Sequence, residues 1–462
     1  MKRGGSLNLG NKHMNCTSTH WINALDLPEK DQKLGLLLRL APLPLGYVHV
    51  LGIRNAVELM KAELERSYRP SAQDMRAIRE IVDIARGYAC LAYGSDAQFV
   101  AGAMGRLPAR PSNPAVMLTG YSGYGKSRLL QAVSRLFETE RFVQPSPSLP
   151  SFPIRSIACV AFERDVTPVG MMNQISNAIG GDADYKAKTQ GDLRHARLRT
   201  YQVGCCCLLL DETQYISRGA DSSALPAKLL GQATGLGPPV IYAANFTLGH
   251  RLKKRPPEDQ RRLLSAPIVM VPDEASDPAF IGFIEDIILV MAGVLRINAK
   301  IDADEIHALS FGLRGPVMDL VLTAYKVART AQTSGEMLEV TMDHVRAANQ
   351  HVYYQHHRES VKTYQNDALG FDKIPLAYKC PFTLPASTAA KIRTHANRIR
   401  QRQVEDRIHE ETRTLSEREA EKLALKARQN VGLKSSVSGV ASLPLAPRVA
   451  RRITADDLRA NL

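Results

Sequence analysis

Residues 115–137 constrain the fold of this chain most strongly. An apolar run at residues 115–119 leads into Gly120-Tyr-Ser-Gly-Tyr-Gly-Lys-Ser127, and residues 128–137 follow with the spacing of an amphipathic helix. A strand, a glycine-rich turn and a helix in this order direct backbone N–H groups and the positive helix end at an anion. The spacing of the glycines, the lysine and the serine is that of a phosphate-binding P-loop. We therefore predict a nucleotide site at this turn.

Each residue type in such a loop has its own task. Lys126 is expected to reach the β- and γ-phosphates, and the Ser127 hydroxyl to ligate Mg²⁺. The full set expected to bind the nucleotide from this segment is Gly120, Tyr121, Ser122, Gly123, Tyr124, Gly125, Lys126, Ser127 and Arg128. The alternative is a glycine-rich turn between a strand and a helix that binds no nucleotide.

A second apolar run, at residues 205–210, ends in two acids. We expect Asp211 to hold Mg²⁺ through water and Glu212 to polarise the water that attacks the γ-phosphate. The alternative is that the two acids only cap a turn after a strand. The three adjacent cysteines of this run are interpreted as small apolar strand residues, because neighbouring strand side chains point to opposite faces and cannot share a metal.

A third apolar run, at residues 239–244, ends in Asn245. An asparagine at this place can hydrogen-bond the γ-phosphate or the attacking water, and would then report the state of the nucleotide. The alternative is a turn-forming asparagine without a ligand.

The pattern along the chain predicts an α/β fold. Five short, almost continuous apolar runs, three of them named above and two at residues 156–162 and 266–271, are separated by stretches long enough for crossover helices, as a parallel sheet covered on both faces requires. Ser71 with Asp74, and Asn55 with Glu58, have the spacing of helix capping boxes. The expected divisions are a disordered start at 1–20, an N-terminal helical domain at 21–111, the α/β nucleotide-binding domain at 112–276, a helical lid at 277–358, and a basic, partly disordered tail at 359–462.

Composition narrows the class of protein further. The chain has 462 residues and a net charge of +14, and about half of the excess positive charge lies after residue 390. Such a field attracts polyanions, so a nucleic-acid partner is expected, although many basic proteins have none. Seven cysteines exclude a disulfide framework, and no apolar run is long enough for a membrane helix. We expect a soluble, cytoplasmic protein without a secretory signal.

Together these motifs resemble those of an AAA+ ATPase. The resemblance rests on residues 120–127, on Asp211-Glu212-Thr-Gln214 and on Asn245, and the arginine-rich run at 245–270 narrows it. That run is similar to the TnsC/TniB regulators, which heteromeric, Tn-seven-like bacterial transposons use to select target DNA. The resemblance covers about residues 112–350, while the N-terminal helices and the tail match only in general arrangement.

The resemblance implies a fold and an activity. The fold would be a P-loop AAA+ domain with a parallel sheet of strand order 5-1-4-3-2, an N-terminal helical domain, a C-terminal helical lid and a flexible basic tail. The activity would be ATP hydrolysis with Mg²⁺. The protein would form a ring or helical filament on double-stranded DNA, nucleoid-associated when bound, and would regulate transposition by linking a target-selector protein to the transposase subunits.

The resemblance also implies roles for arginines. In such assemblies ATP lies between protomers, and an arginine of the neighbour completes the site. Arg261 and Arg262 precede the fifth strand, where this arginine finger belongs, with Arg251 and Arg255 as competitors and a surface pair as the alternative. Arg314, just before a Gly-Pro helix start, would be the sensor arginine of the lid.

The DNA contacts are expected in the stretch that the family turns toward the DNA axis. The candidates there are Arg164, Thr167, Lys186 and Lys188. They would follow the phosphate backbone without reading sequence, and the alternative is a pair of solvated turns.

Two other functions remain open from the sequence. One is a scaffold that binds ATP to assemble but hardly hydrolyses it. The other is a helicase-loader-like or signalling P-loop NTPase that acts on a protein partner alone.

Overall fold

The computed structural model describes residues 20–109, 113–138, 141–144, 147–148, 150–162, 167–180, 193–213, 224–332, 337–371 and 374–412. Residues up to Asn397 belong to one compact unit, and those from Arg398 onward to a second. The expected disordered start lies outside the described residues except for His20, and so does the basic tail beyond Thr412.

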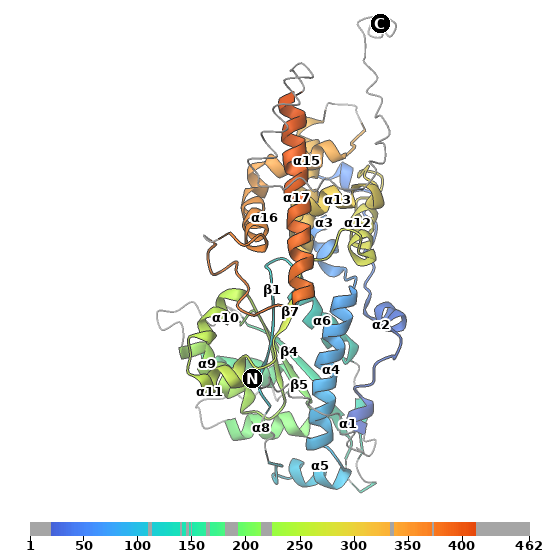
Figure 1. The fold of residues 1–462 in the computed structure, drawn as a ribbon. Coiled ribbons are helices and arrows are strands. Elements are labelled where there is room, and N and C mark those ends of the chain that lie inside the picture. The colour runs from blue at the N-terminus through green and yellow to red at the C-terminus, as the bar shows by residue number, and fades with distance from the viewer. Residues whose placement is uncertain are drawn as a thin grey trace, which may run out of the picture. The chain divides into compact units, whose positions relative to one another are not determined.

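A five-stranded parallel sheet forms the middle of the α/β part of the first unit (Figure 1). Its strands are β1 (Val116–Gly120), β4 (Ile157–Ala161), β5 (Cys207–Asp211), β6 (Val240–Ala244) and β7 (Ile268–Met270). They lie in the order β4-β5-β6-β1-β7, and every neighbouring pair is parallel. If these five strands are numbered 1 to 5 along the chain, their order across the sheet, read from β7, is 5-1-4-3-2. This confirms the predicted α/β fold class and the predicted strand order.

Helices cover both faces of the sheet, which explains why its strands are apolar without alternation. All residues of β1, β5 and β6 are buried. The covering helices that follow β1 in the chain are α6 (Lys126–Leu136), α7 (Pro168–Ala178), α8 (Leu193–Gln202), α9 (Ala224–Thr234), α10 (Phe246–Lys253) and α11 (Pro257–Leu263). Two short strands, β2 (Arg141–Val143) and β3 (Phe152–Ile154), form an antiparallel pair that the apolar pattern did not predict.

The N-terminal region is helical, as expected. Its elements are α1 (His20–Asn23), α2 (Asp31–Leu38), the 3-10 turn η1 (Val48–Val50), α3 (Ile53–Arg66), α4 (Ala72–Ala92) and α5 (Asp96–Ala103). The capping box at Ser71 and Asp74 is confirmed, because each side chain accepts the other's backbone N–H, at 3.1 and 2.8 Å. The capping box at Asn55 and Glu58 is wrong, since α3 begins at Ile53 and both residues lie inside it.

The helices after β7 lie where the sequence predicted a helical lid, and we call them the lid. They are α12 (Pro278–Val290), α13 (Ala299–Ser310), α14 (Arg314–Ala331), α15 (Met342–Gln350) and the 3-10 turn η4 (Val352–Tyr354). Their hydrophobic core also contains Ala56, Val57, Met60 and Leu64 of α3. The N-terminal helices thus pack against two different regions: α3 packs with the lid, while α4 contacts β5 and α6 of the sheet domain. The domain boundaries drawn from the sequence stay predictions.

Two helices lie at and beyond the predicted end of the lid. The first, α16 (Gln355–Ala368), crosses the expected boundary at residue 358, and the second, α17 (Ala386–Thr412), contributes residues to both units. Between them, Phe382 packs against the core of the sheet domain and Lys379 O lies 2.8 Å from Nε2 of His250 in α10. Of the helices that the structure describes, none is both long enough and apolar enough to cross a membrane.

Candidate nucleotide-binding site

Three glycines of the P-loop are each needed for a steric reason. A Cβ at Gly120 would lie 2.6 Å from the carbonyl oxygen of Met270 in β7. Gly123 and Gly125 have φ angles of 82° and 114°, in the left-handed region that favours glycine. Gly125 is also the N-cap of α6. The loop therefore turns sharply from β1 into α6 and leaves the first helical N–H groups facing the carboxyl end of the sheet.

A cavity of about 320 Å³ lies against this loop. Of the predicted site residues, those that line it are Ser122, Gly123, Gly125, Lys126, Ser127, Arg128, Asp211, Glu212, Asn245 and Arg314. Asp211 and Glu212 lie at the end of β5, and Asn245 directly after β6. The strand order explains this meeting, because the carboxyl ends of β5, β6 and β1 are neighbours at one edge.

Lys126 is held by the loop that carries it. Its Nζ donates hydrogen bonds to the carbonyl oxygens of Gly120 and Tyr121, both at 3.1 Å. Burial lowers the pKa of Lys126 to about 8, although the charges of Asp211 and Glu212 oppose this. The ammonium group is therefore partly desolvated and already directed by backbone dipoles, as a phosphate-binding lysine requires.

The two acids after β5 differ in environment. Asp211 is buried, and its Oδ1 accepts the backbone N–H of Glu212 at 2.8 Å. Glu212 has a φ of 55°, a left-handed conformation that is uncommon for a residue other than glycine. Strain of this kind persists where the surrounding structure fixes it, and it is concentrated at functional sites. Asp211 is thus buried at the end of the strand, whereas Glu212, the next residue, is half-buried.

The donor set fits Mg²⁺ bound together with a nucleotide. Within the described part of the chain, no three His, Cys, Asp or Glu side chains group closely enough to hold a metal on their own. Mg²⁺ usually takes one or two protein oxygens and completes its shell with phosphate oxygens and water. The Ser127 hydroxyl and the Asp211 carboxylate, both lining the cavity, supply such a pair.

Arg314 lies at the cavity, but its charge is already paired. It is the first residue of α14, whereas the sequence placed it before the helix. Its Nε donates to Asp273 Oδ2 at 3.1 Å, and its Nη2 lies 3.4 Å from Asp74 Oδ2. Burial lowers the pKa of Arg314, but the two carboxylates outweigh it and raise the pKa overall.

The two loop tyrosines point away from the cavity. Tyr121 packs with its ring centroid 4.5 Å from that of Tyr364 and 5.2 Å from that of Phe246. Tyr124 donates its hydroxyl to Asp74 Oδ1 at 3.1 Å. Neither tyrosine lines the cavity, and neither does Gly120. The sequence placed these residues in the nucleotide set only because they belong to the loop.

Sequence reasoning missed one wall of the cavity. This wall comes from the end of α3 with the segment that follows it and from two lid helices, and consists of Leu64, Glu65, Ser67, Tyr68, Arg69, Phe283 and Met318. None of these residues belongs to a motif, and only the packing of α3 against the lid brings them to the loop. No local sequence signal could have found them.

The arginine-finger candidates lie away from this cavity. Arg261 and Arg262 are exposed in the last turn of α11, and Arg262 lines a separate hollow beside α9. Of the competitors, Arg255 lines the same hollow and pairs with Asp259 at 3.0 Å, while Arg251 lies in α10. A role toward a neighbouring copy stays a prediction.

Three of the four DNA candidates, Arg164, Lys186 and Lys188, lie outside the described residues. The fourth, Thr167, is the N-cap of α7, and its hydroxyl oxygen accepts the backbone N–H of Gly170 at 3.0 Å. That hydroxyl therefore holds the helix start in place.

No protein-family model and no curated protein matches this chain. Solved structures similar to it include the Aeropyrum pernix ORC1 protein in complex with DNA, at 17% identity over 66% of this chain and 81% of that chain, with a TM-score of 0.36. The Aeropyrum pernix ORC2 protein in its ADP form is 12% identical over 77% of this chain and 85% of that chain, with a TM-score of 0.38. Cdc6p from Pyrobaculum aerophilum is 15% identical over 66% and 85%, with a TM-score of 0.37. Values this low do not assign a family or a ligand.

The lowered pKa of Lys126 predicts a pH dependence of nucleotide binding. Phosphate oxygens favour the charged ammonium, so above its pKa of about 8 the lysine must take up a proton when nucleotide binds. We expect the affinity for ADP to be flat below this pH and to fall by up to about tenfold per pH unit above it. Calorimetry across pH 7–10 measures this. Lys126→Arg, which stays charged, should show no such fall, and a flat profile in the parent would contradict the assignment.

The close approach of Gly123 to the lid allows a steric test of the P-loop. A Cβ there would lie 2.7 Å from Cδ of Pro316, whereas Gly105 has a similar φ of 96° with open space around its Cβ position. Gly123→Ala and Gly105→Ala therefore impose similar backbone strain, but only the first forces the loop and α14 apart. We expect roughly tenfold or greater loss of ADP affinity in Gly123→Ala and unchanged affinity in Gly105→Ala. Equal affinities in both variants would show that the loop does not bind the phosphates.

Proposed function

We propose that this protein is an AAA+ ATPase that oligomerises on double-stranded DNA in an ATP-dependent way. By its resemblance to the TnsC/TniB regulators, it would link target-site selection to the transposase. The observation that supports ATP hydrolysis most strongly is the cavity that gathers Lys126, Ser127, Asp211, Glu212 and Asn245 at one edge of the sheet.

In this proposal the loop residues bind and orient the triphosphate. Lys126 exchanges its loop carbonyl partners for β- and γ-phosphate oxygens, and the first N–H groups of α6 bind the same chain of phosphates. Ser127 and Asp211 would hold Mg²⁺, which would neutralise charge on the phosphate oxygens.

Glu212 and Asn245 then orient and polarise the water that attacks the γ-phosphate. Glu212, held by its turn at the end of β5, accepts a hydrogen bond from the water and polarises it toward the γ-phosphate. Asn245 is the N-cap of α10, but its side chain bonds no backbone N–H of that helix. Its amide can therefore orient the water or contact the γ-phosphate.

The wall from α3 and the lid is suited to the base. Leu64, Phe283 and Met318 offer apolar and aromatic surface at the same cavity that holds the phosphates. A nucleotide bound there would contact the sheet domain through its phosphates and the lid through its base, so its binding would favour one lid position.

Assembly would complete the site. Arg261 and Arg262 are exposed and do not line the cavity of their own chain, so only a neighbouring copy could bring them to the nucleotide. An arginine supplied in this way can raise the rate of phosphoryl transfer by about 10³–10⁵. Arg261 and Arg262 are our candidates for that role.

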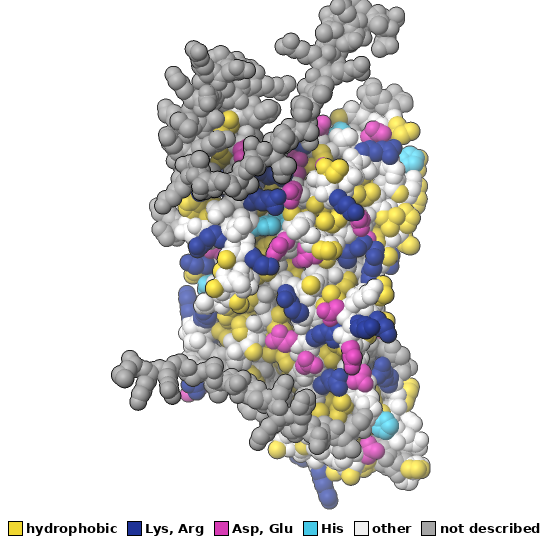
Figure 2. Space-filling view, turned by 45° about the vertical axis from the view of Figure 1, so that its right-hand side comes forward, with side chains coloured by type: hydrophobic (Ala, Val, Ile, Leu, Met, Phe, Trp, Pro, Cys, Tyr) yellow, Lys and Arg dark blue, Asp and Glu magenta, His cyan; other side chains and the backbone are white. Residues whose placement is uncertain are grey.

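The DNA partner rests on the net charge of +14 and on the resemblance. Figure 2 shows a face on which Lys and Arg are interspersed with Asp and Glu, and a surface of mixed sign gives little attraction for a duplex. From the resemblance, we propose that the DNA contacts lie in the stretch around Thr167, with Arg164, Lys186 and Lys188.

Glu212→Gln tests the proposed cycle. The variant keeps the shape of the side chain but cannot accept a proton, so ATP should bind normally while phosphate release falls by about 10²-fold or more. Complexes with duplex DNA formed in ATP should then live longer than those of the parent. Phosphate release and the dissociation of labelled duplex measure the two effects.

Two further variants complete this experiment. Lys126→Ala should abolish nucleotide binding, and Glu285→Gln, an exposed acid-to-amide change on α12, should match the parent in every assay. If Glu212→Gln releases DNA as fast as the parent, hydrolysis does not control the complex. If the parent binds ATP but releases almost no phosphate, the protein is an assembling scaffold.

Phosphate-backbone contact predicts a steep salt dependence. Affinity for duplex DNA should fall by about 10³-fold or more between 50 and 200 mM salt, and should differ little between unrelated sequences. Fluorescence anisotropy with two unrelated duplexes measures both properties. An affinity that does not change with salt, or no binding at all, would favour the helicase-loader-like or signalling NTPase with a protein partner.

A further inference from the structure

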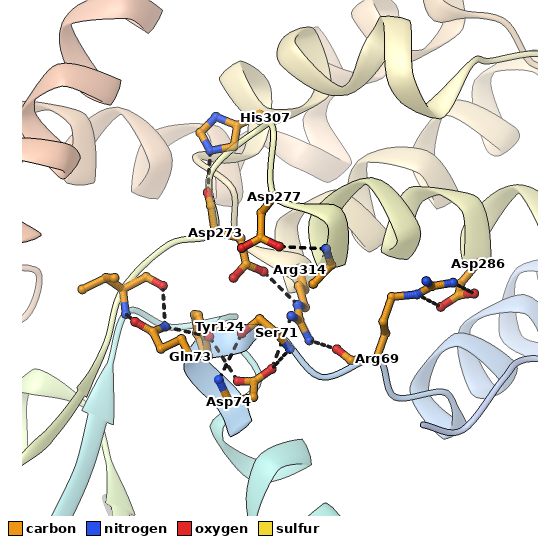
Figure 3. A network of polar contacts seen from close by, with 12 residues as sticks. Arg69, Ser71, Gln73, Asp74, Tyr124, Asp273, Asp277, Asp286, His307 and Arg314 are labelled. Atoms are coloured by element: carbon orange, nitrogen blue, oxygen red, sulfur yellow. Dashed lines mark hydrogen bonds and ion pairs between the residues drawn. The ribbon is translucent and has the colours of Figure 1, made fainter. Parts of the chain in front are cut away.

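A buried polar network connects the P-loop to the N-terminal helices and the lid (Figure 3). On the loop side, Tyr124 donates its hydroxyl to Asp74 Oδ1 of α4 at 3.1 Å. The same hydroxyl oxygen accepts Nε2 of Gln73 at 2.8 Å, and Gln73 also donates to the carbonyl oxygen of Val271 after β7. Tyr124 is 2% exposed, so its hydroxyl depends on these partners rather than on water.

On the lid side, Arg314 joins three segments. It donates from Nε to Asp273 Oδ2 at 3.1 Å and from Nη1 to the carbonyl oxygen of Arg69 at 2.7 Å, and its Nη2 lies 3.4 Å from Asp74 Oδ2. Asp74 and Asp273 are 2% and 5% exposed. Removing one partner from such a buried arrangement leaves an uncompensated charge, which costs far more than an exposed ion pair.

A backbone contact closes the network into a ring. The N–H of Gly315, the residue after Arg314, donates to the carbonyl oxygen of Gly123 at 2.8 Å. Gly123 is covalently joined to Tyr124, which bonds Asp74, which pairs with Arg314. The contacts therefore run from the P-loop to α4, from α4 to α14, and from α14 back to the P-loop. Neither the loop nor α14 can shift without breaking a member of this ring.

We propose that Tyr124, Asp74 and Arg314 are positioning residues that lock the lid helix α14 to the P-loop, so that the phosphate-binding backbone and the lid move together. The P-loop pattern accepts any residue at the position of Tyr124, but here the hydroxyl has a specific partner. The consequence for nucleotide affinity rests on the proposed function, while the lock itself does not.

Arg314 also borders the cavity against the P-loop. Among the residues that the structure describes, its buried Nη2 has no hydrogen-bond partner and only the long ion pair with Asp74. The side chain that holds the lid through Nε and Nη1 therefore lies at the edge of the cavity.

The test of the lock uses the full chain without nucleotide. In Tyr124→Phe, which removes only the hydroxyl, and in Arg314→Lys, the Gly315 N–H should exchange with deuterium roughly tenfold faster, because its bond to Gly123 loses support. Tyr201→Phe is the control, since its buried hydroxyl donates to the carbonyl oxygen of Ala92 at 2.8 Å, away from the ring. Exchange is followed by mass spectrometry of the peptide that contains Gly315.

A second readout separates the lock from the nucleotide site. Affinity for ADP should fall roughly tenfold in Tyr124→Phe and not change in Tyr201→Phe. Unchanged exchange in Tyr124→Phe, with ADP affinity also unchanged, would overturn the lock even if Arg314→Lys failed to fold. If the parent bound no nucleotide while Tyr124→Phe still exchanged faster, the lock would stand and the proposed function would fail.

Discussion

The site depends on how closely the P-loop approaches its neighbours. Gly120 leaves no room for a Cβ against β7, and Gly123 leaves none against Pro316 of the lid. The loop is therefore held between the sheet and α14, and its conformation is fixed by contacts on both sides. A loop fixed in this way presents its N–H groups without the entropy cost of ordering them when a phosphate binds. Lys126, held by two loop carbonyls, shares that preorganisation.

Fixed strand order then brings the other groups to the loop. Because β6 and β5 follow β1 in the sheet, Asn245 and the Asp211–Glu212 turn meet the phosphate loop although they are far from it in sequence. The end of α3, the segment after it and the lid supply the remaining wall. The contacts of the lid with α3 mean that a nucleotide would touch the N-terminal helices and the lid at once.

The sequence predicted what depends on local pattern. The apolar runs gave the strands and the fold class, and Ser71 with Asp74 gave a real helix start. It could not show that Tyr124 turns inward or that Arg314 is paired with Asp273, since both depend on contacts between distant segments. Asn55 and Glu58 matched a capping pattern, but α3 begins at Ile53, with Gly52 as its N-cap, and no capping motif marks that earlier start. Local sequence patterns predicted the helices and strands, whereas the contacts between them depend on how they pack.

The most direct measurement of the central claim is the mass of the parent protein in solution with a non-hydrolysable ATP analogue, Mg²⁺ and duplex DNA, compared with samples lacking one component each. If the nucleotide lies at the interface between two copies, and Arg261 or Arg262 of the neighbouring copy completes its site, the full mixture should contain a large assembly. Samples without nucleotide should contain much smaller species. A single copy of the chain in the complete mixture would contradict the account.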